Sequence, residues 1–129
     1  MKLRTISIGA LALFFIASGI NHFVNPHTYL AMMPDWLPRH EAMNVISGAA
    51  EIAGGLGVLI RRLRRLAGWG LMDLLIAVFP ANIHTALHGW PGVNIPRWLL
   101  WLRLPVQPLL MIWVWWTAIR PDSRPVAMA

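Results

Sequence analysis

The sequence contains no cysteine, and only 12% of its 129 residues are charged. Without cysteine the chain cannot form a disulfide, a thiol redox pair, a cysteine-ligated iron–sulfur cluster or a covalent c-type haem site. Redox chemistry would therefore need a bound molecule or a partner protein. Because 57% of the residues are apolar, the composition argues against a water-soluble globule and excludes a disordered chain.

The net charge of +6 is not arranged as a nucleic-acid interface requires. Such an interface carries its basic residues along one stripe or face. Here they form short clusters between long apolar runs. We therefore predict a lipid bilayer as the surroundings of the chain, and no nucleic acid among its partners.

Four apolar runs are long enough to cross a membrane, because ~18 to 22 helical residues at ~1.5 Å each span the ~30 Å hydrocarbon layer. The sequence thus predicts an all-α, four-transmembrane-helix bundle that forms a single membrane domain over residues 1–129. The predicted helices cover about 6–23, 38–60, 66–88 and 97–119, and a tail follows at 120–129. The first run, after Lys2 and Arg4, also fits a signal peptide, but we expect it to be retained.

The basic residues between the runs predict the orientation of the chain. One side receives eight of them, and the other side receives only Arg39 and Arg97. By the positive-inside rule, the eight and both termini are expected in the cytoplasm. Short basic turns without other targeting signals favour a bacterial inner (plasma) membrane. The eight are Lys2, Arg4, Arg61, Arg62, Arg64, Arg65, Arg120 and Arg124.

The first outer loop carries signals for a short helix of its own. Asn25 and Pro26 can begin a helix, Pro34 ends it, and Pro38 suits the opening position of the next membrane helix. We predict a short interfacial helix that forms a lid over the outer side of the bundle.

Ionisable residues inside the runs are candidates for function, because lipid disfavours them. They are Glu51, Asp73 and Arg103, with Gln107 one turn after Arg103. We expect Glu51 and Arg103 to form a buried pair. Such a pair would lock the bundle, anchor an anionic or carbonyl-bearing ligand, or let Glu51 transfer protons.

The third run places Ala77, Pro80 and His84 within about 40° of Asp73, and we expect this stripe to face the bundle. Asp73 is expected to be a packing residue bonded to Ser7 or to a backbone group. His84 and His88 have the i, i+4 spacing of metal ligands, but no second histidine pair accompanies them. Hydrogen-bonded histidines are therefore preferred over a metal or haem site.

Four segments together carry a family resemblance. They are G-I-N-H-F at 19–23, S-G-A-A-E-I-A-G-G at 47–55, F-P-A-N-I-H at 79–84 and R-L-P-V-Q at 103–107. In this order they resemble the small DoxX-like integral membrane proteins. The resemblance implies four membrane helices and an association, in some relatives, with thiosulfate:quinone oxidoreductase or with membrane redox and detoxification complexes. The family motifs fall on Asn21, His22, Glu51, Pro80, Asn82, Arg103 and Gln107.

The two lines of reasoning predict one outward-facing polar pocket within the membrane, and they assign no catalytic residue. We expect a redox-associated subunit that is not an enzyme by itself and binds a small lipophilic ligand such as a quinone. Its expected partners are membrane redox-complex subunits or further copies of the chain. The alternatives are a non-catalytic assembly subunit and a small transporter. The predicted ligand-binding residues are Asn21, His22, Glu51, Asn82, His84, Arg103 and Gln107.

Overall fold

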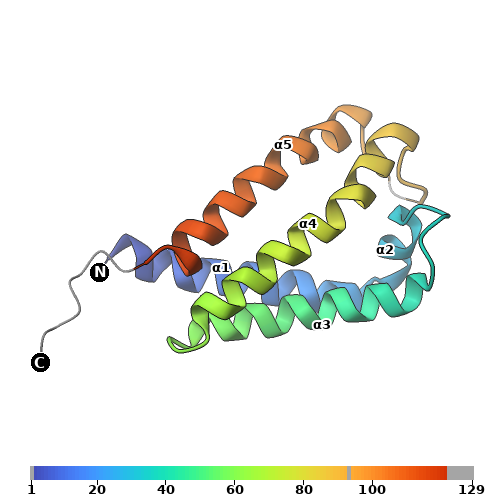
Figure 1. Cartoon of the computed structure of the whole chain (residues 1–129). Helices are drawn as coiled ribbons and strands as arrows, with labels where there is room; N and C mark the ends of the chain where they lie inside the picture. The colour runs from blue at the N-terminus through green and yellow to red at the C-terminus, as the bar shows by residue number, and fades with distance from the viewer. Residues whose placement is uncertain (1, 93, 122–129) are drawn as a thin grey trace, which may run out of the picture.

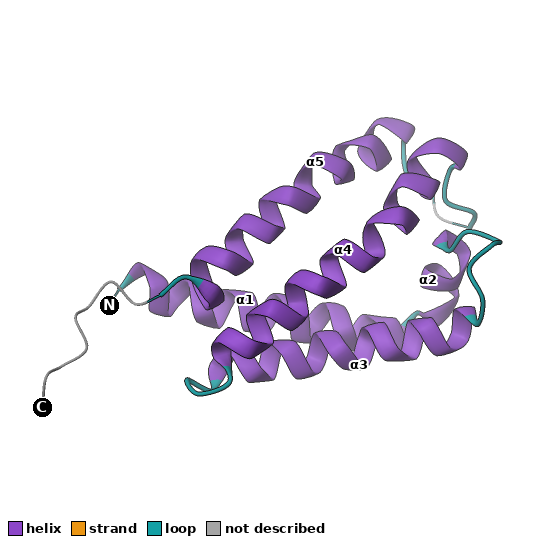
Figure 2. Cartoon of the chain, viewed as in Figure 1, coloured by secondary structure: helices purple, strands orange, loops and turns teal. Residues whose placement is uncertain are grey.

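The computed structural model of the chain describes residues 2–92 and 94–121, and these residues form helices without strands (Figures 1 and 2). The predicted orientation of Met1 and Ala129, and most of the predicted tail, lie outside the described residues. Four helices are long and apolar enough to cross a membrane, which confirms the all-α fold and the number of candidate spans. The elements are α1 (Leu3–Val24), α2 (Pro26–Met32), α3 (His40–Leu59), α4 (Arg64–His88), α5 (Arg97–Val114) and the π-helical turn η1 (Trp115–Ile119).

Proline and backbone strain fix the connection between α1 and α3. Pro26 occupies the first turn of α2, where the missing N–H has no intrahelical partner to lose. Helix α3 begins at His40, two residues after Pro38, because Arg39 adopts a left-handed conformation with φ of 54°. The expected short helix is present as α2.

Helices α1 and α3 are antiparallel neighbours whose backbones come unusually close (Figure 1). A Cβ atom added to Gly19 would lie 2.7 Å from the backbone oxygen of Gly48. One added to Gly55 would lie 2.9 Å from the backbone oxygen of Ala12. Small residues at such crossings let membrane helices pack at backbone distance. This contact brings the polar residues of the two helices within hydrogen-bonding range.

The apolar core lies between α1, α3, α4 and the end of α5. Its buried members include Phe15, Val58, Leu71 and Val114. Beside it, Ser7 Oγ lies 2.6 Å from Thr117 Oγ1 and accepts a 2.8 Å hydrogen bond from Trp113 Nε1. These bonds attach the C-terminal turn to α1, so Ser7 is not the partner of Asp73 that we had expected.

The expectation that the Asp73 stripe of α4 faces the bundle is wrong. Asp73, Ala77 and Pro80 are all exposed on the outside of the bundle, so the stripe does not face its neighbours. The opposite face of α4, with Leu71, Leu75 and other residues, is buried. Because α4 is apolar on nearly all sides, periodicity did not identify which face packs inward.

The two ends of the molecule differ. At one end Arg4 Nη2 donates a 2.7 Å hydrogen bond to the backbone oxygen of Arg120, and the turn at 60–63 between α3 and α4 lies at this same end (Figure 1). At the other end α4 and α5 lean away from α1 and α3, and α2 lies near the opening between them (Figure 1).

The close approach of α1 and α3 predicts that Gly19→Ala destabilises the bundle by about 1–3 kcal/mol, because the new methyl group meets backbone that cannot rotate away. Unfolding in detergent micelles would measure the change. Gly9→Ala on the same helix is the matched control, since nothing lies within 4 Å of its added Cβ. Equal stability of the two variants would contradict the packing described here.

Candidate functional site

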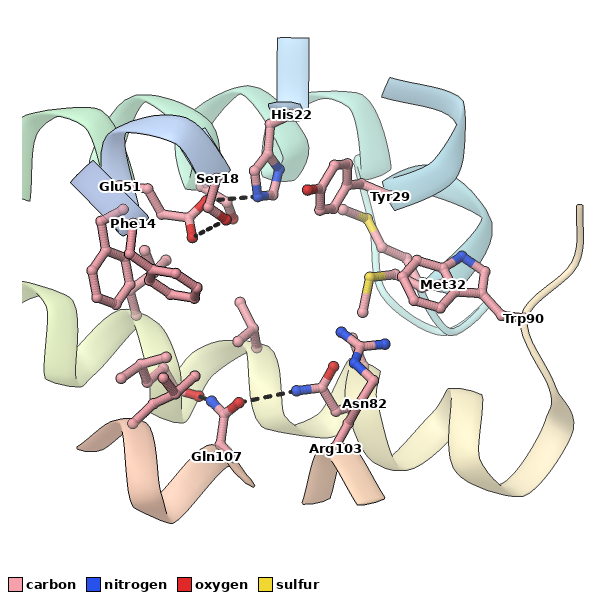
Figure 3. Close-up of a pocket in the computed structure, with 18 residues that line it drawn as sticks. Phe14, Ser18, His22, Tyr29, Met32, Glu51, Asn82, Trp90, Arg103 and Gln107 are labelled. Carbon is pink, nitrogen blue, oxygen red and sulfur yellow. Dashed lines mark hydrogen bonds and ion pairs between the residues drawn. The ribbon is translucent and has the colours of Figure 1, made fainter. Parts of the chain in front are cut away.

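A cavity of about 250 Å³ lies between the four long helices, on the side where α2 lies across them (Figure 3). Part of its wall is apolar and includes Phe14, Phe15, Leu75 and Leu110. The rest is aromatic or polar. These remaining residues include Ser18, His22, Tyr29, Glu51, Asn82, Trp90, Arg103 and Gln107.

Glu51 of α3 is held by two residues of α1. His22 Nε2 lies 2.7 Å from Glu51 Oε2, and Ser18 donates a 3.0 Å hydrogen bond to Glu51 Oε1. Ser18 and His22 are one helical turn apart and therefore share a face of α1. The carboxyl group thus has a partner on each oxygen, and both partners come from the helix that the glycines bring close.

The hydrogen bonds around His22 define which of its nitrogens carries a fixed proton. Asn44 Nδ2 donates to the backbone oxygen of His22 at 2.9 Å, which turns Asn44 Oδ1 toward His22 Nδ1 at 2.8 Å. An amide oxygen only accepts, so Nδ1 carries a hydrogen. Nε2 then faces the Glu51 carboxyl group at 2.7 Å, so a base and an acid lie close enough to exchange a proton.

Helix α2 is attached to the cavity wall by side chains from both halves of the chain. The Tyr29 ring stacks on His22 with 3.7 Å between centroids, and its hydroxyl accepts a 2.7 Å hydrogen bond from Asn21. Trp90 Nε1 donates to the backbone oxygen of Thr28 at 2.7 Å. The short helix therefore supplies the Tyr29 ring to the cavity wall, and contacts at Thr28 and Tyr29 fix its position.

Arg103 lies across the cavity from Glu51 and does not pair with it (Figure 3). Its guanidinium stacks over the Trp90 ring at 4.7 Å, while Nη1 is buried with no hydrogen-bond partner among the described residues. The expected Glu51–Arg103 pair is wrong because His22, which is closer, already satisfies the carboxylate. The cavity therefore contains a cationic donor that nothing in the described chain neutralises.

Asn82 and Gln107 form a second polar pair, which joins α4 to α5. Asn82 Nδ2 donates to Gln107 Oε1 at 3.1 Å, and Gln107 Nε2 donates to the backbone oxygen of Leu75. The bond to Leu75 lies beside the part of α4 interrupted by Pro80, where the helix loses a backbone donor. Asn82 Oδ1 is buried with no hydrogen-bond partner in the described part of the chain, so this wall offers a free acceptor.

Most of the residues predicted from the sequence meet in this cavity, namely His22, Glu51, Asn82, Arg103 and Gln107. Two do not line it. Asn21 is bonded to Tyr29 behind the wall, and His84 lies against His88, with 4.7 Å between ring centroids. The described residues contain no cluster of three or more metal-ligating side chains.

Sequence reasoning missed Ser18, Tyr29 and Trp90 as members of the site. Ser18 could have been found, since it precedes His22 by one turn on the same helix face. Tyr29 belongs to the predicted short helix, but the sequence does not show which of its side chains faces the cavity. Trp90 could not have been found, because it reaches the cavity from a connection whose path the sequence does not specify.

Comparison with models of protein families gives a match over most of the chain. A family model described as a domain of unknown function (DUF8561) matches residues 11–118, which include most or all of each long helix. No curated protein and no solved structure matches the chain.

The geometry predicts energetic coupling between His22 and Glu51. Glu51→Gln and His22→Asn should each destabilise the bundle, and the double variant should recover part of the loss, with a coupling of about 0.5–3 kcal/mol. A double-mutant cycle by unfolding in detergent measures this. The same cycle with Arg103→Gln is the control, and its losses should add to within about 0.5 kcal/mol. Stronger coupling of Glu51 to Arg103 than to His22 would overturn the assignment of the pair.

Proposed function

The chain belongs to the DUF8561 family, and from the geometry of the cavity we propose that it is a membrane subunit that binds a small lipophilic ligand with carbonyl oxygens, such as a quinone. The observation that carries the proposal is the buried Nη1 of Arg103, which has no partner in the described chain. Leaving a charged donor unsatisfied away from water is costly, and a ligand carbonyl oxygen removes that cost.

The shape and lining of the cavity support a lipophilic ring. Its volume of about 250 Å³ lies just below the roughly 300–1,000 Å³ of sites for drug-sized ligands, so it suits a single ring whose tail extends into the bilayer. Phe14, Met32 and Trp90 supply flat or adaptable apolar contacts. A carbonyl oxygen accepts from Arg103, and in the reduced ligand a hydroxyl group donates to Asn82 Oδ1.

The His22–Glu51 pair gives the site a means of moving a proton. Reduction of a quinone to a quinol takes up two electrons and two protons. The chain has no cysteine, and in the proposal the electrons come from a partner oxidoreductase. The pair exchanges protons with the bound ring, so the chain is a redox-associated subunit and not an enzyme by itself. The resemblance to DoxX-like proteins supports the same association.

The proposed orientation places both termini in the cytoplasm and α2 at the outer interface of a bacterial inner membrane. It is supported by the charge asymmetry, since Lys2, Arg4 and the basic turn from Arg61 lie at one end of the bundle (Figure 1). The cavity then opens in the outer half of the bilayer beneath α2.

A second candidate function is that of an assembly subunit without a ligand. It is favoured by the number of polar bonds that join helices, such as Asn44 to His22 and Asn82 to Gln107. In that case the polar residues hold the bundle together, and Arg103 acts only through its stacking on Trp90.

Ligand binding predicts that a short-chain benzoquinone raises the thermal unfolding midpoint of the purified protein in nanodiscs. At 100 times the dissociation constant the stabilisation should be about 2.7 kcal/mol. Arg103→Gln should abolish the shift while the apo protein stays folded, because the variant removes a donor that has no protein partner.

The matched control is Arg120→Gln. Arg120 also stacks on a tryptophan, with 4.8 Å to the Trp116 ring, but it does not line the cavity. If added quinone did not change the unfolding midpoint of the unmodified protein, ligand binding would be contradicted. An Arg103→Gln variant that unfolds without ligand would favour the assembly role.

The orientation predicts opposite labelling of single cysteines by a membrane-impermeant thiol reagent. Because the natural chain has no cysteine, Arg62→Cys and Gly92→Cys each provide one clean site. In intact cells Gly92→Cys should react, whereas Arg62→Cys should react only after the membrane is opened. Reaction of Arg62→Cys in intact cells would reverse the proposed topology.

A further inference from the structure

Asp73 lies near the middle of α4 with its side chain on the outside of the bundle. It is about 4.5 Å along the axis from the helix midpoint at Ile76. All other exposed charged side chains of the described residues lie in a connection or near the end of a helix. Asp73 forms no hydrogen bond or ion pair with any part of the chain that the structure describes.

This position is costly for a single copy in lipid. A membrane helix keeps an ionisable residue facing protein or water, because hydrocarbon offers no partner for it. The cavity lies on the other side of α4, where Leu75 and Asn82 reach inward. The partner of Asp73 must therefore come from outside the part of the chain that the structure describes.

The residues around Asp73 form two different edges. On one edge Gly70 and Ala77 lie about 60° and 40° from Asp73. Both are exposed, and a Cβ added to Gly70 meets nothing within 4 Å. On the other edge Trp69 and Ile76 lie about 40° and 60° away, and their side chains are 50% and 55% exposed. One edge is thus a shallow groove, and the other is a ridge of bulky side chains.

We propose that this face of α4 binds the same face of a second copy of the chain, with the two Asp73 carboxyl groups at the centre. Copies inserted with the same topology have parallel α4 helices. Around a two-fold axis along such helices, the small edge of each copy meets the bulky edge of the other. Trp69 and Ile76 then fill the groove at Gly70 and Ala77, as an isologous interface requires.

The carboxyl groups complete the contact chemically. When both carboxyl groups carry a proton, the hydroxyl of each donates to the carbonyl oxygen of the other, and the pair is neutral. This pairing gives each Asp73 carboxyl group a hydrogen-bond partner without any other protein. An unrelated partner would have to match the groove, the ridge and the position of Asp73 along the helix. The interface leaves the cavity and α2 free, so it does not depend on the proposed ligand.

The absence of cysteine makes the proposal testable in native membranes. Leu66→Cys places a thiol about 20° from Asp73 on the same face, where the residue is 72% exposed. Leu59→Cys is the control, because Leu59 is 49% exposed at the neighbouring end of α3. Mild oxidation should crosslink the Leu66→Cys chain to a dimer several-fold more efficiently than the Leu59→Cys chain.

Two further variants test the contact itself in the Leu66→Cys background. Gly70→Leu should reduce crosslinking to the level of Leu59→Cys, since it fills the groove from a position where an added Cβ meets nothing within 4 Å. Gly9→Leu is the matched control on α1 and should leave crosslinking unchanged, because nothing lies near its added Cβ either. Asp73→Asn should retain the dimer through paired amides, whereas Asp73→Leu should weaken it.

Several outcomes would overturn the proposal. One is equal crosslinking of Leu66→Cys and Leu59→Cys. Another is a dimer that tolerates Gly70→Leu. A third is crosslinking of the Leu66→Cys chain to a different protein in a manner that needs Asp73, which would assign the face to that protein. The Gly70→Leu variant should still show the quinone-induced rise in its unfolding midpoint, because a monomer keeps its own cavity. Loss of the dimer can therefore be distinguished from loss of ligand binding.

Discussion

The structure depends on one constraint, which is that polar groups inside a bilayer must find their partners within protein. The contact between α1 and α3 satisfies this constraint because glycine residues let the two helices approach closely. Because Gly19 and Gly48 bring the two backbones together, Glu51 reaches Ser18 and His22, and Asn44 bonds both to the ring of His22 and to its backbone oxygen. A larger residue at either glycine would separate the donors from the acceptors. The close packing of these two helices and the hydrogen bonds of their polar side chains therefore depend on the same glycines.

The same constraint explains why the cavity has two different sides. On the α1–α3 side, the acidic and basic groups satisfy one another. On the α4–α5 side, Asn82 donates a hydrogen bond to Gln107, but Arg103 Nη1 and Asn82 Oδ1 have no hydrogen-bond partner among residues 2–92 and 94–121. If Arg103 paired with Glu51, the cavity would contain no free cation and His22 would lose its proton partner. The observed division keeps the His22–Glu51 pair and the Arg103 guanidinium in one cavity without an ion pair between Glu51 and Arg103.

Much of this arrangement could be predicted from the sequence. The four long helices follow from run length, and His22, Glu51, Arg103 and their neighbours follow from the rule that ionisable residues in lipid are unusual. The partners of those residues could not be predicted, since the sequence does not give the distance across the bundle. The orientation of α4 could not either. That helix is apolar all round, so Asp73 marks a special face without indicating whether the face turns inward or outward. The polar stripe alone did not decide between a buried contact and an external one.

Unsatisfied groups in a membrane protein point to molecules outside the chain, and the shape around each group indicates the kind of molecule. Arg103 Nη1 lies in a concave space of about 250 Å³, which admits a small ring but no helix. Asp73 lies on an open helix face between a groove and a ridge, which offers a small molecule no enclosure but fits another helix. Because the two groups are on opposite sides of α4, one partner can bind without displacing the other. The wall between them is α4, which contains Pro80 between Asp73 and Asn82, so this helix presents Asn82 to the cavity and Asp73 to the outside of the bundle.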